Sequence, residues 1–415
     1  MNLWVLILNY LKSRPLNTAL NILLLALGIA MISILVVFNR QFQEKITSNS
    51  KGIDLVVGAK GSPMQLILCN IFHVDFPTGN IRLVEAERVA RHRLVKRAIP
   101  LALGDNYRGF RIIGTSHDYA DLYDAKLSQG SLWKEPMEVV IGSDVARALQ
   151  LSLGSQFTSS HGLSDETHAH DEQQFVVKGI LQKANNVVDN LILTGVESIW
   201  QVHAVHDETT SSEQSPVRDS SGSSLVPSVA QGDSSKEITA MLVQYRSAMG
   251  AIQLPRWVNS QSSLQAASPA FETARLFSIL GVGVDILKGF AAVLVFISAL
   301  SIFIALYNSL KERRYDLAIM RSMGASRTKV FISVLLEGTV LALAGAVVGI
   351  VLAHSVMAGI SMFVQEARMA GISSLVFYPE EGLILAGSLL LGVVCSMLPA
   401  WQAYRIDISR VLAGA

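Results

Sequence analysis

The chain has 415 residues, of which 50% are hydrophobic and 16% are charged, whereas about 25% of the residues of a soluble protein are charged. The mean hydropathy is +0.40, and these values together exclude an ordinary soluble protein. The net charge of +1 gives no reason to expect nucleic acid as a partner. The cysteines Cys69 and Cys395 lie in a polar and an apolar segment, so we expect no disulfide framework.

Four apolar runs are long enough to cross a membrane. The first has 23 residues without a charge, which at about 1.5 Å per residue reaches roughly 34 Å. A cleaved signal peptide would have a shorter apolar core and a small-residue cleavage site, so we expect an uncleaved anchor. The predicted spans are Leu16–Phe38, Gly289–Tyr307, Phe331–Ala353 and Gly382–Leu398.

The charges of the short loops predict the orientation of these spans. Basic residues gather before the first span, between the second and third, and after the fourth: Lys12, Arg14, Lys311, Arg313, Arg314, Arg321, Arg327, Lys329, Arg405 and Arg410. The loop between the third and fourth spans is acidic instead, because it holds Glu366, Glu380 and Glu381 against one basic residue, Arg368. Because short basic loops stay in the cytoplasm, we expect both termini there and residues 40–280 outside.

Residues 40–280 read as a soluble α+β domain inserted between spans one and two of a four-span, α-helical membrane protein. Apolar, β-branched runs predict strands at Ile53–Val57, Phe110–Gly114, Glu138–Gly142, Phe175–Leu181 and Met241–Tyr245. Helical spacing is found at Leu83–Lys96 and Ser143–Leu149. The remaining parts would be 1–39, an N-terminal interfacial helix with the first span, and 281–415, the other three spans.

Two further segments of this outer domain stand apart. Ten of the 31 residues from Asp207 to Glu237 are serine and show almost no apolar periodicity, so residues 207–237 are predicted to be a flexible insertion. The stretch Pro269–Lys288 is amphipathic and helical in pattern. We expect it to continue into the second span as one stalk.

The loop between the second and third spans, residues 308–329, carries the most specific pattern of the chain. It reads Lys311-Glu312-Arg313-Arg314-Tyr315-Asp316-Leu317-Ala318-Ile319-Met320-Arg321-Ser322-Met323-Gly324-Ala325-Ser326-Arg327. This resembles the loop of FtsX-like permeases, which include the MacB-type and lipoprotein-releasing transporters and follow roughly E-R-R-x-E-I-A-x-L-R-A-x-G-A-S. Asp316 stands where the pattern has Glu, and Met320 where it often has Leu.

The resemblance extends to two other segments of the chain. The third span opens with Leu335-Leu336-Glu337-Gly338, and the fourth ends in Pro399-Ala400-Trp401-Gln402-Ala403-Tyr404-Arg405-Ile406-Asp407. Both are similar to the family, although Ile408 replaces its final Pro. In the outer domain only Val57–Pro63 resembles family members.

Membership would imply the permease subunit of an ABC transporter in a bacterial inner membrane, working by mechanotransmission. Two of these subunits, as a homodimer or with a close paralogue, would carry separate ATPase subunits on the cytoplasmic face. ATP and Mg²⁺ would bind to that partner, so this chain would be no enzyme and hold no cofactor of its own. Residues 40–280 would be the MacB-like periplasmic core domain and 281–415 the FtsX-like permease domain. Membrane lipid, and a periplasmic protein, lipoprotein, peptide or other hydrophobic cargo, would be the further partners.

An amphipathic helix in the loop would offer apolar side chains to a groove of the ATPase and charges at its rim, and Gly324 would end it. We therefore predict an ATPase-coupling role for nine residues: Glu312, Arg313, Arg314, Leu317, Ile319, Met320, Arg321, Met323 and Gly324. The alternative is that the basic residues only enforce topology.

No Gly-Lys-Ser or Gly-Lys-Thr of a phosphate-binding loop occurs in the chain, so ATP hydrolysis is expected on another polypeptide. Glu337 and His354 of the third span are expected to be structural, with a proton or substrate relay as the alternative. Gly345, Gly349 and Ala353 line one face of this span, where small residues let helices approach closely. We favour packing within the subunit over a dimer contact.

Histidines suggest a competing, metal-linked function. Imidazole and carboxylate groups suit Zn²⁺, and five histidines lie near acidic residues in the outer domain: His161, His168, His170, His203 and His206. Cys69, His73 and Asp75 form a second, weaker cluster. The alternative is an exposed polar loop without metal. A membrane scaffold or regulator that transports nothing and acts on an extracytoplasmic partner is the third function left open.

Overall fold

The computed structural model describes residues 12–13, 15–161, 174–202, 236–363, 373 and 375–405, without side chains at 104, 105, 160 and 161. The chain divides into two units. The membrane unit comprises Met1–Gln43, Ser278–Arg368 and Ile372–Ala415, and the outer unit comprises Glu44–Phe277 and Met369–Gly371. Each unit has a core of its own.

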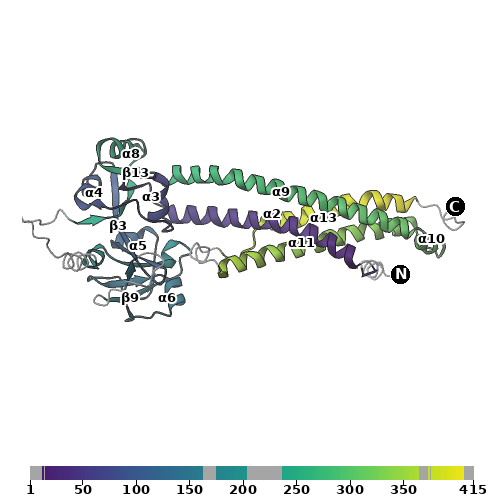
Figure 1. The fold of residues 1–415 in the computed structure, drawn as a ribbon, viewed down its shortest axis with the longest axis horizontal. Helices are drawn as coiled ribbons and strands as arrows, with labels where there is room; N and C mark the ends of the chain where they lie inside the picture. The colour runs from purple at the N-terminus through teal and green to yellow at the C-terminus, as the bar shows by residue number, and fades with distance from the viewer. Residues whose placement is uncertain are drawn as a thin grey trace, which may run out of the picture. The chain divides into compact units, whose positions relative to one another are not determined.

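Four helices of the described residues are long and apolar enough to span a membrane, which confirms the predicted number of spans. They are α2 (Pro15–Ser50), α9 (Pro269–Glu312), α11 (Arg327–Phe363) and α13 (Pro379–Tyr404), labelled in Figure 1. Their common core contains residues from each helix: Leu25, Ile29, Ile302, Leu306, Ala342, Ala346, Ile350, Ile384, Leu385, Leu391 and Cys395.

Two of these helices run past the apolar stretches that predicted them. The helix α2 continues beyond Phe38 to Ser50 without a break. The helix α9 is continuous from Pro269 to Glu312, as expected for the stalk and the second span together. Both helices therefore belong partly to the membrane unit and partly to the outer unit.

The outer unit is built on one mixed sheet of eleven described strands. Nine of them follow the order β13-β1-β12-β3-β4-β10-β6-β9-β5, with β7 paired to β9 and β8 to β3. The strands are β1 Leu55–Ala59, β3 Val95–Tyr107, β4 Phe110–Thr115, β5 Leu127–Gly130, β6 Glu138–Ile141, β7 Gln156–Phe157, β8 Ser160–His161, β9 Phe175–Leu181, β10 Leu191–Gly195, β12 Ala240–Tyr245 and β13 Leu264–Ala267. The pairs β4–β10 and β6–β9 are parallel and the other pairs are antiparallel.

Short helices cover both faces of this sheet. They are α3 Pro63–Asn70, α4 Leu83–Ala90, α5 His117–Leu122, α6 Ser143–Leu149, the 3₁₀ helix η1 Val187–Asn190 and α8 Met249–Gln261, and a small ribbon pairs β2 Ile81–Arg82 with β11 Glu237–Ile238. Because alternate strand residues point to opposite faces, Val57 lies in the core under α4, α6 and α8, whereas Val56 lies in the core under α3, α5 and η1. Burial of both faces explains why the strands read as continuous apolar runs.

One prediction about the outer unit was wrong in part, and another falls mostly outside the described residues. The predicted helix Leu83–Lys96 was too long: α4 ends at Ala90 because Val95 begins β3 and pairs with Tyr245 of β12. Most of the predicted insertion 207–237 lies outside the described residues. Its last residue, Glu237, belongs to β11 and its carbonyl accepts a hydrogen bond from Trp200 Nε1.

Candidate functional site

The predicted coupling loop folds as a short helix, α10 (Arg314–Ser322), between α9 and α11. Gly324 has a φ of +101°, and the backbone N–H of Ala325 bonds to the carbonyl of Met320, which closes the C-terminus of α10. Ser326 then caps α11, since its hydroxyl accepts the backbone N–H of Lys329 at 3.3 Å. The Gly-Ala-Ser segment thus ends one helix and begins the next.

One face of α10 is held by the membrane unit. Leu317 and Ala318 are buried, and Leu317 packs with residues of α9, α11 and α13: Leu310, Val330, Val334, Ala400 and Ala403. Met320 is half-buried against the same cluster. The predicted apolar residues Leu317 and Met320 therefore anchor α10 to the bundle rather than facing a partner.

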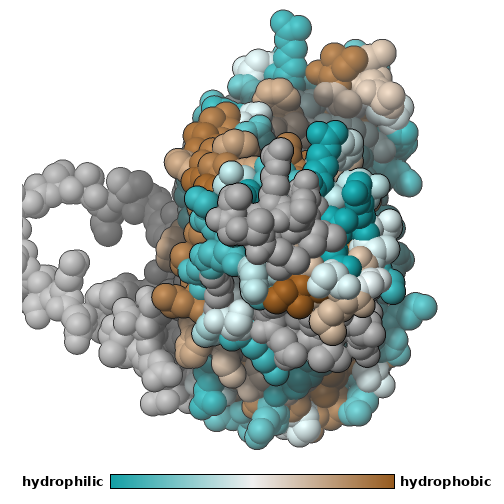
Figure 2. All heavy atoms as spheres, turned by 90° about the vertical axis from the view of Figure 1, so that its right-hand side faces the viewer, coloured by the Kyte–Doolittle hydropathy of each residue, from teal (hydrophilic) through white to brown (hydrophobic). Residues whose placement is uncertain are grey.

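The opposite face of α10 carries an exposed apolar stripe, which we call the α10 stripe. It consists of Tyr315, Ile319 and Met323, which are 57%, 37% and 81% exposed. Residues four positions apart lie on one face of a helix, so these three side chains form one surface. Figure 2 views the molecule from the right-hand side of Figure 1 and shows hydrophobic and hydrophilic residues mixed on that face. The sequence analysis did not include Tyr315 in the coupling set, although its spacing of four residues from Ile319 places both on one face of a helix.

The charged residues of the predicted coupling set do not share one environment. Glu312 and Arg314 are exposed and Arg321 is half-exposed, which suits charges at a rim. Arg313 is turned inward instead, and its side chain is only 13% exposed. Its guanidinium belongs to the interior of the membrane unit.

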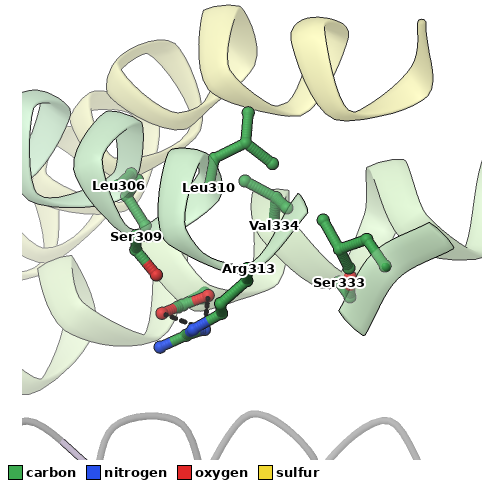
Figure 3. A pocket seen from close by; sticks show the side chains of 8 residues that line it. Leu306, Ser309, Leu310, Arg313, Ser333 and Val334 are labelled. Carbon is green, nitrogen blue, oxygen red and sulfur yellow. Dashed lines mark hydrogen bonds and ion pairs between the residues drawn. The ribbon is translucent and has the colours of Figure 1, made fainter. Parts of the chain in front are cut away.

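Arg313 forms a buried ion pair with Glu337 of α11. Arg313 Nη1 lies 3.4 Å from both Glu337 Oε1 and Oε2, and the Glu337 side chain is 11% exposed. The pair lines a cavity of about 20 Å³ together with Leu306, Ser309, Leu310, Leu317, Ser333 and Val334 (Figure 3). A cavity needs about 10–15 Å³ of such space to hold one water molecule. Glu337 is thus a structural partner of the coupling loop, which sequence spacing did not reveal.

A second polar cluster joins three helices of the membrane unit. Glu381 Oε1 of α13 accepts hydrogen bonds from Ser33 Oγ of α2 at 2.8 Å and from His354 Nε2 of α11 at 2.9 Å. Glu381 Oε2 accepts the backbone N–H of Tyr378 at 3.2 Å. A buried carboxylate is stable when its oxygens are bonded in this way, and the structural role of His354 stays a prediction beside the alternative of a relay.

Gly345, Gly349 and Ala353 lie on the face of α11 that meets α2. A Cβ atom on Gly345 would come within 3.0 Å of Leu25, and one on Gly349 would lie 2.8 Å from the carbonyl oxygen of Ala26. Ala353 is 1% exposed. The structure places the two glycines against a helix of the same chain.

The predicted metal site lies almost wholly outside the described residues. His168, His170, His203 and His206 are not described, and of His161 only the backbone is, in β8. Among the described side chains no group of three or more His, Cys, Asp or Glu could hold a metal. Zinc binding therefore stays a prediction.

The prediction of a second, weaker metal site at Cys69, His73 and Asp75 was wrong. Arg111 comes between its members: Nη1 lies 3.7 Å from Cys69 Sγ, and Nη2 donates to the backbone carbonyl of Asp75. Burial raises the pKa of the Cys69 thiol, and His73 Nε2 bonds to Tyr119 Oη at 3.0 Å. A guanidinium at this place repels a cation.

A four-span helical unit with an α/β domain inserted between its first two spans defines a multi-pass membrane protein with a large extramembrane domain. The model of the MacB-like periplasmic core domain matches residues 18–245, more than half of the chain, and the model of the FtsX-like permease C-terminal matches residues 288–408. The chain belongs to the FtsX-like and MacB-like family of ABC transporter permeases, and its four apolar helices make it a multi-pass membrane protein.

Curated relatives are permeases of the same kind. An uncharacterized ABC transporter permease of Methanocaldococcus jannaschii is 26% identical over 137 residues, which cover 33% of this chain and 34% of that protein. The uncharacterized ABC transporter permease YknZ of Bacillus subtilis (strain 168) is 26% identical over 148 residues, 36% of each chain. The matched region spans about a third of each relative.

Solved structures of outer domains also match. The periplasmic region of MacB from Actinobacillus actinomycetemcomitans is 14% identical, with a TM-score of 0.34, and covers 56% of this chain and 97% of that chain. The extracellular domain of the noncanonic ABC-type transporter YknZ from Gram-positive bacteria is 12% identical, with a TM-score of 0.31, and covers 52% and 99%.

Proposed function

We propose that this chain is the permease subunit of an ABC complex whose ATPase is a separate polypeptide that docks on the α10 stripe. The observation that carries the proposal is the division of α10 into two faces. Leu317 fixes one face to the bundle, and Tyr315, Ile319 and Met323 expose an apolar surface on the other. A short helix fixed to the bundle on one side and apolar on the other is suited to a hydrophobic groove of a partner.

The charges flanking the stripe support a cytoplasmic position for it. Lys311, Arg314, Arg327 and Lys329 are exposed near the ends of α10, and short basic loops remain in the cytoplasm. Both termini then lie on that side, and the outer unit lies on the other. ATP and Mg²⁺ bind to the partner, and hydrolysis there moves the outer unit against a lipoprotein, a peptide or another hydrophobic cargo.

A second copy of the chain completes the proposed complex. The helix α9 exposes a seam of Ile279, Val282, Ile286, Phe290 and Val293, which are 55% to 64% exposed. Their spacing of three and four residues is that of helices that pack along their length. The seam supports pairing of two permease subunits through α9.

The test is a pull-down of the tagged chain from its native membrane in mild detergent, with mass spectrometry of the retained proteins. An ATPase with a phosphate-binding loop should be recovered in equal amounts. Ile319→Glu and Met323→Glu should each reduce this recovery at least about tenfold, which corresponds to about 1.4 kcal/mol. Thr328→Glu is the matched control, because it adds the same charge at an exposed site of α11 outside the stripe. Full recovery of the ATPase with both stripe variants contradicts the docking site, and no ATPase with the unaltered chain contradicts the function.

A further inference from the structure

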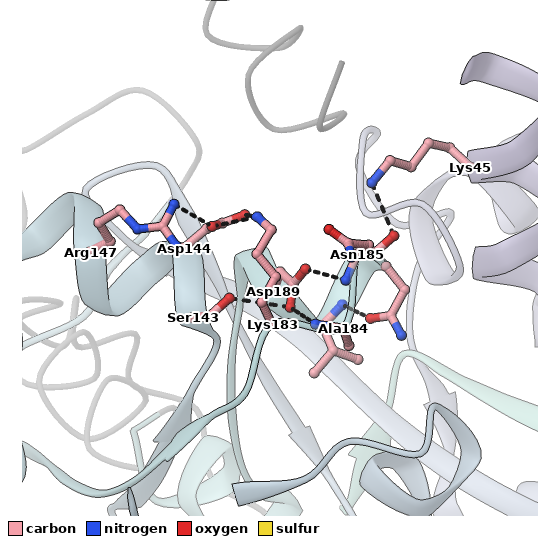
Figure 4. A network of polar contacts seen from close by, with 10 residues as sticks. Lys45, Ser143, Asp144, Arg147, Lys183, Ala184, Asn185 and Asp189 are labelled. Carbon is pink, nitrogen blue, oxygen red and sulfur yellow. Dashed lines mark hydrogen bonds and ion pairs between the residues drawn. The ribbon is translucent and has the colours of Figure 1, made fainter. Parts of the chain in front are cut away.

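The last turns of α2, which belong to the outer unit, are attached to the segment before β10. Asn49 is 9% exposed, and its Oδ1 accepts the backbone N–H of Val187 at 2.9 Å. The backbone carbonyl of Asn49 accepts the hydroxyl of the buried Tyr123 at 2.8 Å. One turn earlier, Lys45 Nζ donates to the backbone carbonyl of Asn185 at 3.1 Å (Figure 4). Ile46, also buried, lies on the same part of the helix.

The segment that receives α2 is held in shape by a buried carboxylate. Asp189 is 2% exposed and accepts the backbone N–H groups of Ala184 and Asn185 at 2.8 and 2.7 Å, and the hydroxyl of Ser143 at 3.3 Å (Figure 4). Asn185 has a φ of +57°, in the left-handed region that asparagine adopts more readily than most other non-glycine residues. The carbonyl of Asn185 and the amide of Val187 are therefore presented to α2 in a fixed arrangement.

The same segment is tied to the rest of the outer unit. Lys183 Nζ lies 2.8 Å from both carboxylate oxygens of Asp144 on α6. The 3₁₀ helix η1 leads directly into β10, which pairs with β4 on one side and β6 on the other, near the middle of the sheet. A displacement of α2 at Asn49 thus reaches the middle of the sheet through Val187 and β10.

The covalent connection between α2 and the sheet is a second route. The chain turns at Lys51 and Gly52, where Gly52 has a φ of +79°, before β1 begins at Leu55. The turn is closed by the backbone N–H of Ile53, which bonds to the carbonyl of Ser50 at 3.1 Å, and Gln244 Nε2 donates to the carbonyl of Gly52 at 2.7 Å. The bonds of Lys45 and Asn49 lead to β10 near the middle of the sheet, whereas this turn leads to β1 near its edge.

We propose that Asn49 and Lys45 are positioning residues that fasten α2 to η1, so that the outer unit follows α2 as one body. The attachment deepens the proposed function, on which its role in transmission rests, by naming the residues through which movement of the first span reaches the outer unit. Its existence as a rigid joint does not depend on an ATPase, so the two parts can be tested separately.

The joint is tested in the full chain in lipid nanodiscs. Spin labels replace two exposed residues, Glu44→Cys on α2 and Lys134→Cys on the sheet domain, and the distribution of distances between them is measured. Asn49→Ala removes the acceptor for Val187, whereas Asn49→Asp retains one. Asn259→Ala is the matched control, because Asn259 Oδ1 accepts the backbone N–H of Ala266 at 2.7 Å in the same way but away from α2.

We expect a narrow distribution in the unaltered chain, in Asn49→Asp and in Asn259→Ala, and a distribution at least about twofold broader in Asn49→Ala. The amide of Val187 should exchange with solvent at least about fivefold faster in Asn49→Ala alone, as expected for the loss of one hydrogen bond. An unprotected Val187 amide in the unaltered chain, or an unchanged distribution in Asn49→Ala, overturns the joint.

Transmission is tested in the same variants with the ATPase bound. The distance between labels at Thr328→Cys of α11 and Lys134→Cys should change when ATP is added to the unaltered chain. Asn49→Ala should retain ATP hydrolysis within about twofold but lose more than half of this change, and Asn49→Asp should restore it. Equal displacement in Asn49→Ala overturns the role in transmission. No displacement in the unaltered chain overturns the proposed function, whatever the first measurement shows of the joint.

Discussion

Arg313 Nη1 lies at the same distance, 3.4 Å, from both carboxylate oxygens of Glu337. Their ion pair joins Arg313, which directly precedes α10, to α11 of the bundle, and both side chains are largely buried. Together with Leu317 and Ala318, this pair fixes the position of α10, so in the proposed complex a force on the α10 stripe would be passed to α11 and α9. Rigid attachment of this kind is what a docking helix needs in order to transmit movement.

Removing one member of this pair should destabilise the membrane unit. Arg313→Met or Glu337→Met breaks the ion pair and leaves one of its two buried charges in place, which costs about 3–5 kcal/mol. The double substitution leaves no such charge and should cost less than the sum of the two. The free energy of unfolding in detergent, measured over the double-mutant cycle, shows the coupling directly. Single variants as stable as the unaltered chain would contradict the structural role.

The same contact separates Arg313 from Arg314, which the sequence pattern treats alike. Arg314→Glu changes an exposed residue and should weaken ATPase recovery while leaving the unfolding free energy within about 0.5 kcal/mol. Arg313→Glu places a second carboxylate against Glu337 and should destabilise the chain itself. Equal loss of stability in both variants, measured by the same unfolding experiment, would show that the two arginines share one environment after all.

The spans and strands could be predicted from the sequence because they depend on local composition. An uncharged run such as Leu16–Phe38 has to cross the bilayer, and an apolar, β-branched run such as Phe175–Leu181 suits a strand buried on both faces. The inward orientation of the Arg313 side chain could not be predicted, because it depends on where α9 ends and α10 begins and on the position of α11 beside them. The bond from Ser33 to Glu381 joins residues 348 positions apart, and no local pattern indicates such a contact.

The close approach of α2 and α11 makes a prediction about glycine. Gly349→Ala puts a Cβ atom 2.8 Å from the carbonyl oxygen of Ala26 and 2.9 Å from the Cβ of Ile29, so the helices have to separate, at a cost of about 1–3 kcal/mol. Gly359→Ala on the same helix meets no atom within 4 Å. It should be neutral or stabilising by up to about 1 kcal/mol, since alanine favours helix. Unfolding of both variants in detergent measures the difference, and equal stability would place the contact elsewhere.

The neighbouring residues Glu380 and Glu381 of α13 should differ in how much they contribute to the free energy of unfolding. Glu381→Leu removes the acceptor that Ser33, His354 and the amide of Tyr378 share, and the loss of a buried hydrogen-bond partner costs about 1–3 kcal/mol. Glu380 forms an ion pair with Arg40 at 2.9 Å, but the side chains of Glu380 and Arg40 are 35% and 49% exposed. Ion pairs exposed to this degree contribute about 0–1 kcal/mol. Glu380→Leu is therefore the control. The unfolding free energies should rank accordingly, and a larger loss for the Glu380 variant would refute the cluster.

The buried histidine of the outer unit makes stability depend on pH. Burial, and then the charge of Arg111, lower the pKa of His73 to about 3, whereas an unfolded chain has a histidine pKa of about 6.5. As the pH falls below 6.5 the unfolded chain binds a proton that the folded chain refuses until about pH 3, so stability is complete above 6.5 and is lost across this interval.

The loss is about 1.4 kcal/mol for each pH unit, or roughly 2 kcal/mol between pH 6.5 and 5. Urea unfolding of the full chain, followed by tryptophan fluorescence at pH 7 and pH 5, should show this loss in the unaltered protein. His73→Gln, which keeps a group able to bond Tyr119 but does not titrate, should show a loss smaller by about that amount. Because the two proteins share every carboxylate, the difference between them isolates His73, and identical losses would mean that this histidine is charged in the folded protein.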